Sequence, residues 1–108
     1  MIIAPVVANP KRVHAGSIVV ITAETRTNAG VLTTPGTSYT IAIFSPTGAT
    51  AQSATTMTAS ATGILTYTFA TTTAMTAGEY TYELVMTHTD GVSRVRTYPG
   101  NAANFELD

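Results

Sequence analysis

The stretch TAGEYTYELVMTHTDGVSRV, residues 76–95, decides the fold of this chain. Between Glu79 and Thr89 the apolar side chains fall on every second position, which is the period of a β-strand with one buried face. The side chains that this spacing turns inward are Tyr80, Tyr82, Leu84 and Met86. The sequence Thr89-Asp90-Gly91 predicts a tight turn. Residues 79–98 are therefore predicted to form a β-hairpin.

Similar runs, separated by turns rich in Gly, Pro and Asn, continue on both sides of this hairpin. The predicted strands are residues 2–8, 17–27, 37–45, one short strand within 49–63, 64–71, 79–89, 92–98 and a final strand or tail at 105–107. Whether residues 49–61 are strand or loop stays open. No segment has a helical period, so we predict an all-β protein, an antiparallel sandwich of about seven strands in two sheets. Residues 1–108 are predicted to be a single domain, with short extended arms at 1–8 and 102–108.

The segment Thr76-Ala77-Gly78-Glu79-Tyr80-Thr81-Tyr82 resembles the entry to strand F of immunoglobulin-like domains, where the familiar form is Asp-x-Gly-x-Tyr-x-Cys. The resemblance implies that Tyr80 is the corner tyrosine, with its hydroxyl bonded to backbone a few residues upstream. Thr76 replaces the acid, Tyr82 replaces the cysteine, and no tryptophan is present, so Ile41 or Ile43 is expected in its place.

The stretch Phe44-Ser45-Pro46-Thr47-Gly48, followed later by Gly78-Glu79-Tyr80, is similar to the rhythm of macroglobulin-like and bacterial immunoglobulin-like domains. The resemblance covers about residues 14–98 and concerns the fold. It specifies no activity.

The composition restricts the partners of this chain. Only 10% of the 108 residues are charged and the net charge is −1, so the clustered Lys and Arg that nucleic acid or anionic lipid would need are missing. The chain has 23 threonines, whose β-branched side chains favour strands and give a neutral, polar surface. It has no cysteine, hence no disulfide framework and no thiolate metal site.

The N-terminal sequence MIIAPVVANPKRV has no basic segment before its short apolar run, so no signal peptide is predicted. No run approaches the roughly 20 apolar residues of a transmembrane helix. We expect a chain that folds in a cytoplasm, and a domain excised from a larger protein is the alternative.

Candidate catalytic and metal-binding groups are sparse. Glu24, Glu79 and Glu83 are expected on outer, solvated faces rather than in a cleft. His88, Asp90 and Ser93 could imitate a hydrolase triad, but a single exposed turn lacks a pocket and an oxyanion hole. His14 and His88 lack metal-ligand spacing, and the set Asp90, Asn101, Asn104 and Asp108 lacks the Asp-x-Asp rhythm of a calcium loop. We expect no enzymatic activity, no cofactor and no metal.

Aliphatic and aromatic side chains that alternate away from the main core face are candidates for contact with another macromolecule, because a lone domain rarely exposes a large apolar area. The expected interface residues are Ile2, Ile3, Ile18, Val20, Phe44, Val85 and Tyr98. Tyr98 and Phe44 are also the aromatic residues expected to be exposed, which is few for a sugar-binding platform.

The resemblance to immunoglobulin-like domains, in a short, cysteine-free, Thr-rich chain, implies an accessory virion protein of a tailed bacteriophage, such as a capsid cement or decoration subunit or a tail adaptor. Such a protein would be made in the host cytoplasm, reside in the virion and bind a capsid or tail protein, as a homo-oligomer. No nucleic-acid or membrane partner is expected. The alternative is a carbohydrate- or cell-surface-binding accessory domain of a larger secreted protein.

Overall fold

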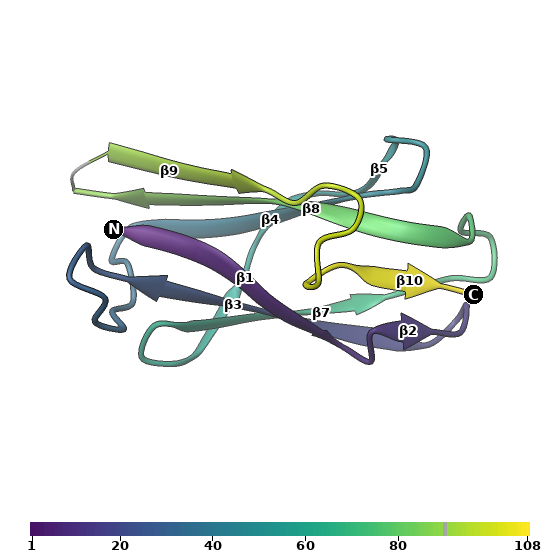
Figure 1. Ribbon diagram of the computed structural model, residues 1–108, viewed down its shortest axis with the longest axis horizontal. Coiled ribbons are helices and arrows are strands. Elements are labelled where there is room, and N and C mark those ends of the chain that lie inside the picture. The colour runs from purple at the N-terminus through teal and green to yellow at the C-terminus, as the bar shows by residue number, and fades with distance from the viewer. Residues whose placement is uncertain (90) are drawn as a thin grey trace.

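The computed structural model describes residues 1–89 and 91–108 and contains only strands and loops (Figure 1). The ten strands are β1 (Ile2–Asn9), β2 (Arg12–Val13), β3 (Ile18–Arg26), β4 (Ser38–Phe44), β5 (Thr50–Thr56), β6 (Thr58–Ala61), β7 (Ile64–Ala70), β8 (Gly78–His88), β9 (Gly91–Arg96) and β10 (Phe105–Leu107). The predicted all-β class is confirmed. The strand number exceeds seven because residues 12–13 add a short strand to a sheet edge and residues 49–61 form two strands.

The strands form two packed sheets, with β1-β3-β7-β6 in one and β2-β10-β8-β4-β5 in the other. Strand β8 pairs with β4 on one side, and on its other side with β10 near its start and β9 near its end. The β8–β9 pairing confirms the predicted hairpin, whose turn residue Asp90 lies outside the described residues. All these pairs are antiparallel except β2 with β10. The sandwich is elongated, 40 × 23 × 22 Å, with its termini at opposite ends (Figure 1).

The interior follows the alternation of β8, and the four side chains predicted to face inward, from Tyr80 to Met86, are buried. The Tyr80 hydroxyl donates to the Thr76 carbonyl oxygen at 2.8 Å, which is the bond implied by the resemblance to immunoglobulin-like domains. Phe105 stacks on Tyr80, with ring centroids 4.9 Å apart, while Ile41 and Ile43 fill the core beside them. Aromatic and aliphatic packing thus replaces the disulfide and tryptophan that the chain lacks.

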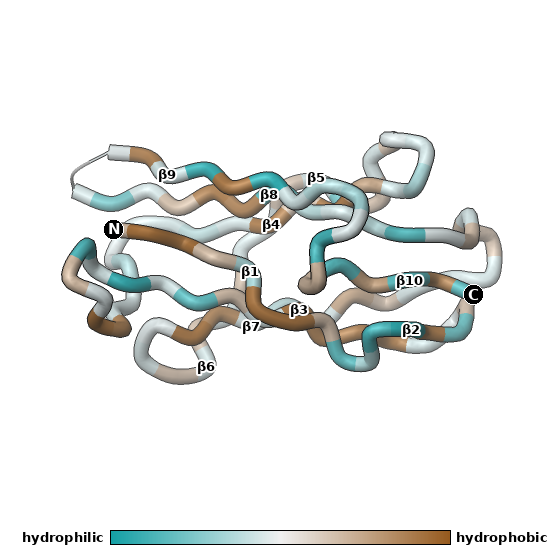
Figure 2. The backbone as a smooth tube through the Cα atoms, viewed as in Figure 1, coloured by the Kyte–Doolittle hydropathy of each residue, from teal (hydrophilic) through white to brown (hydrophobic). Residues whose placement is uncertain are grey.

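The two predicted arms are integral strands rather than extensions. Residues Ile2–Asn9 pair with β3 along their length, apart from a bulge between Pro5 and Val7. At the other end, β10 lies between β8 and β2. Figure 2 shows hydrophobic residues along β1, and burying some of them against the domain's own second sheet explains why this segment does not project.

Three threonines buried at the ends of strands tie loops to the sheets. Thr25 Oγ1 donates to the Thr33 carbonyl at 2.7 Å, Thr71 Oγ1 accepts from the Gly16 amide at 3.1 Å, and Thr97 Oγ1 accepts from the Tyr82 amide at 2.8 Å. Beside Thr25, Gly63 has a φ of +69°, and a Cβ there would lie 2.8 Å from the Thr25 carbonyl oxygen. This position therefore requires glycine for both its conformation and its space.

Candidate functional site

The two outer faces of the sandwich differ in chemistry. The outward side chains of β1, β3 and β7 form what we call the neutral face. Its residues are Ile2, Ala4, Val7, Asn9, Ile18, Val20, Thr22, Glu24, Arg26, Ile64, Thr66, Thr68 and Ala70. The pairing register sets Val20 between Asn9 and Thr68. The face is therefore a sheet surface made mainly of aliphatic and threonine side chains, with charge confined to Glu24 and Arg26.

These two charges bind each other at one end of the neutral face. Arg26 Nη2 lies 2.8 Å from Glu24 Oε2, and Arg26 Nη1 donates to the Gly30 carbonyl at 2.9 Å. The pair borders a small depression of about 110 Å³ that Ile2 and Ala4 also line. The neutral face thus has an apolar notch, and its charges are already paired.

The opposite side of the molecule, formed by β2, β10, β8, β4 and β9, is the charged face. Its outward residues include Arg12, Phe44, Glu79, Glu83, Val85, Val92, Arg94, Arg96 and Glu106. Arg94 pairs with Glu83 at 3.7 Å, and the Arg96 guanidinium lies 4.3 Å above the centre of the Phe44 ring. Most of the chain's ionic groups are therefore collected on this side.

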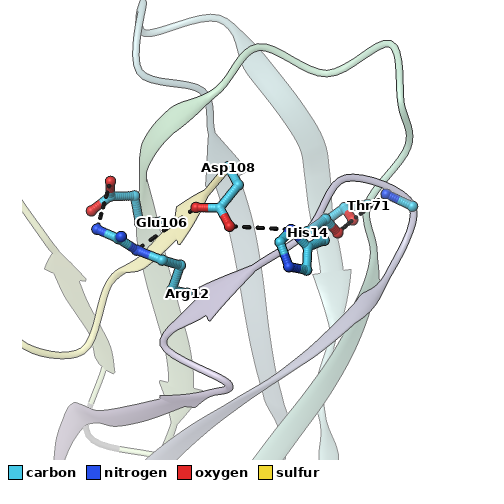
Figure 3. A network of polar contacts seen from close by, with 6 residues as sticks. Arg12, His14, Thr71, Glu106 and Asp108 are labelled. Atoms are coloured by element: carbon cyan, nitrogen blue, oxygen red, sulfur yellow. Dashed lines mark hydrogen bonds and ion pairs between the residues drawn. The ribbon is translucent and has the colours of Figure 1, made fainter.

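At the end of the charged face, charged groups of β2 and β10 meet (Figure 3). Arg12 Nη2 lies 3.3 Å from Glu106 Oε1, and Arg12 Nε lies 3.7 Å from Asp108 Oδ1. His14 Nδ1 lies 3.2 Å from the other oxygen of Asp108. These side chains are substantially exposed, so each contact contributes little to stability by itself.

The most elaborate polar arrangement surrounds Glu79. The Gly100 amide and the Asn104 side-chain amide both donate to Glu79 Oε2, at 2.8 and 2.9 Å. The hydrogen bond from Asn104, followed by that from Gly100, lowers the pKa of Glu79 below its usual value of 4.5. The same Asn104 nitrogen donates to the Tyr98 carbonyl at 2.9 Å, and Asn104 itself is buried. The segment from Tyr98 to Asn104 is thereby wrapped around one carboxylate.

Glu79 lies on the outer face, as expected, but its carboxylate is doubly hydrogen-bonded rather than free in solvent. The partner residues lie more than twenty positions away in sequence. The signal available in the sequence was the pair Asn101 and Asn104 after a Pro-Gly turn, which by itself does not indicate an acid as partner.

The predicted interface residues do not share one surface. Ile2, Ile18 and Val20 lie on the neutral face, whereas Phe44 and Val85 lie on the charged face. Tyr98 is exposed just beyond β9. The prediction that Ile3 is an interface residue is wrong. Ile3 is 1% exposed and belongs to the core, while its neighbour Ile2 is 53% exposed. Alternation along β1 places these two side chains on opposite sides of the sheet.

The candidate catalytic and metal groups are distributed over both ends of the molecule. His88 Nε2 lies 3.4 Å from Ser93 Oγ, which donates to the Met1 carbonyl at 3.0 Å, while Asp90 is outside the described residues. Asp108 contacts His14 and Arg12, whereas the Asn104 side chain donates to Glu79. Within residues 1–89 and 91–108 no three His, Asp or Glu side chains gather as metal ligands. The same residues include no helix able to cross a membrane.

No known protein family matches this sequence. No curated protein matches it either.

Solved structures do resemble it. The Lin-41 filamin domain superposes with a TM-score of 0.65 at 20% identity, covering 98% of this chain and 91% of that one. CopC from Methylosinus trichosporium OB3b gives 0.54 at 19% identity, covering 96% and 91%. Pseudomonas fluorescens alkylpurine DNA glycosylase AlkC, bound to DNA containing an abasic site analog, gives 0.51 at 16% identity, covering 97% of this chain and 29% of the glycosylase. At these identities the likeness concerns the fold, and the chain has an immunoglobulin-like β-sandwich fold.

Proposed function

We propose that this domain is a non-enzymatic structural subunit of a virion, of the bacteriophage capsid cement, decoration or tail-adaptor kind. It acts through protein–protein contacts made by the neutral face. The observation that carries this proposal is the chemistry of that face, where Ile18 is 57% exposed beside Ala70 and Val20, and threonines follow along the strands. Contact with another protein there removes apolar area from water and leaves no unpaired charge to desolvate.

The size of the neutral face supports a multivalent role. With strands about 4.8 Å apart and a rise of about 3.3 Å per residue, its three strands of about seven residues cover about 330 Å². A standard stable interface buries about 800 Å² on each partner. A single contact through this face is therefore weak. Many copies held at neighbouring positions on a shell would raise the overall strength by avidity, about 10²- to 10⁴-fold.

The test uses particles from a culture that carries the gene, separated on a density gradient, with an antibody against the full chain. The chain should sediment with the particles and be labelled on their surface. The variant Ile18→Asp should move to the soluble fractions, because it puts a charge on the apolar part of the neutral face.

The matched control is Val92→Asp, since Val92 on the charged face is also 57% exposed. It should stay with the particles. The proposal is wrong if the wild-type chain never sediments with particles, or if both variants are retained or lost equally.

A further inference from the structure

Two adjoining depressions on the charged face share Glu79. The larger one, about 390 Å³, is also lined by Lys11, Arg12 and Asn101. The smaller one, about 170 Å³, is also lined by Thr81, Arg96 and Tyr98. The larger volume is within the range of about 300–1,000 Å³ that small-molecule sites occupy. We call the two depressions together the Glu79 groove.

The Glu79 groove is built on a rigid frame. The buried Asn104 amide nitrogen holds the Glu79 carboxylate and the Tyr98 carbonyl, both at 2.9 Å, so the acid is fixed relative to the backbone at Tyr98. The Tyr98 side chain is nevertheless 67% exposed. Asn104 Oδ1 is buried and has no hydrogen-bond partner among the described residues. Leaving a buried acceptor unpaired costs free energy of folding, and the fold alone does not explain it. An exposed aromatic ring beside an anchored carboxylate is a recognition arrangement rather than a packing one.

The charges of the Glu79 groove restrict what it binds. Phosphate or sulfate would meet the ionised Glu79 carboxylate, which joins the two depressions. A cation would meet Lys11, Arg12 and Arg96. Lys11 Nζ already donates a hydrogen bond to the Ala102 carbonyl at 2.9 Å. Its positive charge therefore balances the Glu79 carboxylate and does not form a free anion site. A neutral ligand rich in hydroxyl groups avoids both repulsions, because each hydroxyl both donates and accepts.

We propose that the Glu79 groove binds a neutral saccharide. The sugar ring lies with its C–H face on the Tyr98 ring, and its hydroxyls donate to the Glu79 carboxylate and accept from Arg and Asn donors along the groove. The groove is on the side opposite the neutral face, so a subunit docked by that face would present the groove outward. The saccharide site does not depend on the docking proposal, and the two are tested with different variants.

The test is an NMR titration of the ¹⁵N-labelled full chain with maltose, lactose, cellobiose and N,N′-diacetylchitobiose, each at millimolar concentration. At least one of these sugars should shift the amide signals of Tyr98, Gly100 and Asn104. For that sugar, Tyr98→Ala should weaken binding about three- to tenfold through loss of the stacking surface. Tyr98→Phe should bind as the wild type does.

Glu79→Gln should weaken binding about tenfold, because a neutral acceptor makes weaker hydrogen bonds than a carboxylate. Glu83→Gln is the matched control, an acid on the same strand outside the groove, and should bind normally. Thermal unfolding of each variant separates loss of the groove from loss of the fold. The proposal fails if none of the four sugars shifts these amides, if shifts map to the neutral face, or if inorganic phosphate shifts them more strongly than any sugar.

Discussion

The neutral face and the charged face belong to the same sandwich and differ in how far polar side chains hold their strands and loops together. On the neutral face the strands hold one another by backbone pairing, and its single ion pair lies at one end. On the charged face a buried amide, a carboxylate and an arginine over a phenylalanine ring bind loops and strands together. The contrast indicates that the first face is suited to being covered by protein, whereas the second is suited to contact with polar ligands.

The sharpest way to break this comparison is to remove the buried amide. Asn104→Ala should lower the free energy of unfolding by about 1–3 kcal/mol, because the Tyr98 carbonyl and the Glu79 carboxylate each lose a buried donor. The neutral-face counterpart, Thr22→Val, keeps the β-branched shape and should change it by about 0.5 kcal/mol or less. Urea denaturation measures both, and equal costs would show that the two faces are held in the same way.

The pH dependence of stability should also belong to the charged face. Hydrogen bonding lowers the pKa of Glu79 in the folded chain. The stabilisation of the fold by the ionised Glu79 carboxylate is therefore complete at pH values above 4.5, the usual pKa of this group. It should be lost as pH falls from there through the folded-state pKa. Denaturation curves measured across acidic pH should show a shallower decline for Glu79→Gln than for Glu83→Gln. An unchanged profile in Glu79→Gln would contradict this assignment.

A smaller effect is expected from the cation–π pair. Arg96→Gln should cost about 0.5–1 kcal/mol, which is the usual contribution of an exposed guanidinium over an aromatic ring. Arg94→Gln is the matched control. Arg94 lies 3.7 Å from Glu83 at an exposed site, so removing this pair should leave the free energy of unfolding almost unchanged. Thermal unfolding distinguishes the two, and a larger loss for Arg94→Gln would reverse the interpretation.

The smallest effect should come from discharging the neutral face. The double variant Glu24→Gln, Arg26→Gln should unfold within about 0.5 kcal/mol of the wild type, because ion pairs at the partly exposed surface contribute little. Any difference should diminish as salt is added, since ions screen the pair. Denaturation at low and high ionic strength measures this. A loss above about 2 kcal/mol would mean that the pair organises the neutral face.

Local pattern was sufficient for much of the fold. The alternation around Tyr82 predicted the core side of β8, and the resemblance to immunoglobulin-like domains implied the bond from Tyr80 to upstream backbone, whose acceptor is Thr76. The pattern failed for residues 49–61, where small residues pair through the backbone without a hydrophobic signal. It also failed for Ile3, which was grouped with Ile2 although neighbouring strand residues face opposite ways.

The candidate sites were less accessible to sequence reasoning. Tyr98 was expected to be exposed, and it is, but its proximity to Glu79 depends on Asn104 reaching back across the sheet. Likewise, Ile18 and Phe44 were placed in one interface although they lie on opposite faces. Alternation identifies the two sides of a strand but does not say which sheet the strand joins.

The sequence alone determined the low charge, most of the strands and their inward side chains, because a strand's alternation depends on residues within a few positions of one another. The tertiary structure decided that the charges gather on one face, that Phe105 stacks on Tyr80, and that a carboxylate and an amide 25 residues apart meet. These features arise from pairing register and sheet packing, which join distant segments. No local periodicity encodes which distant segments those are.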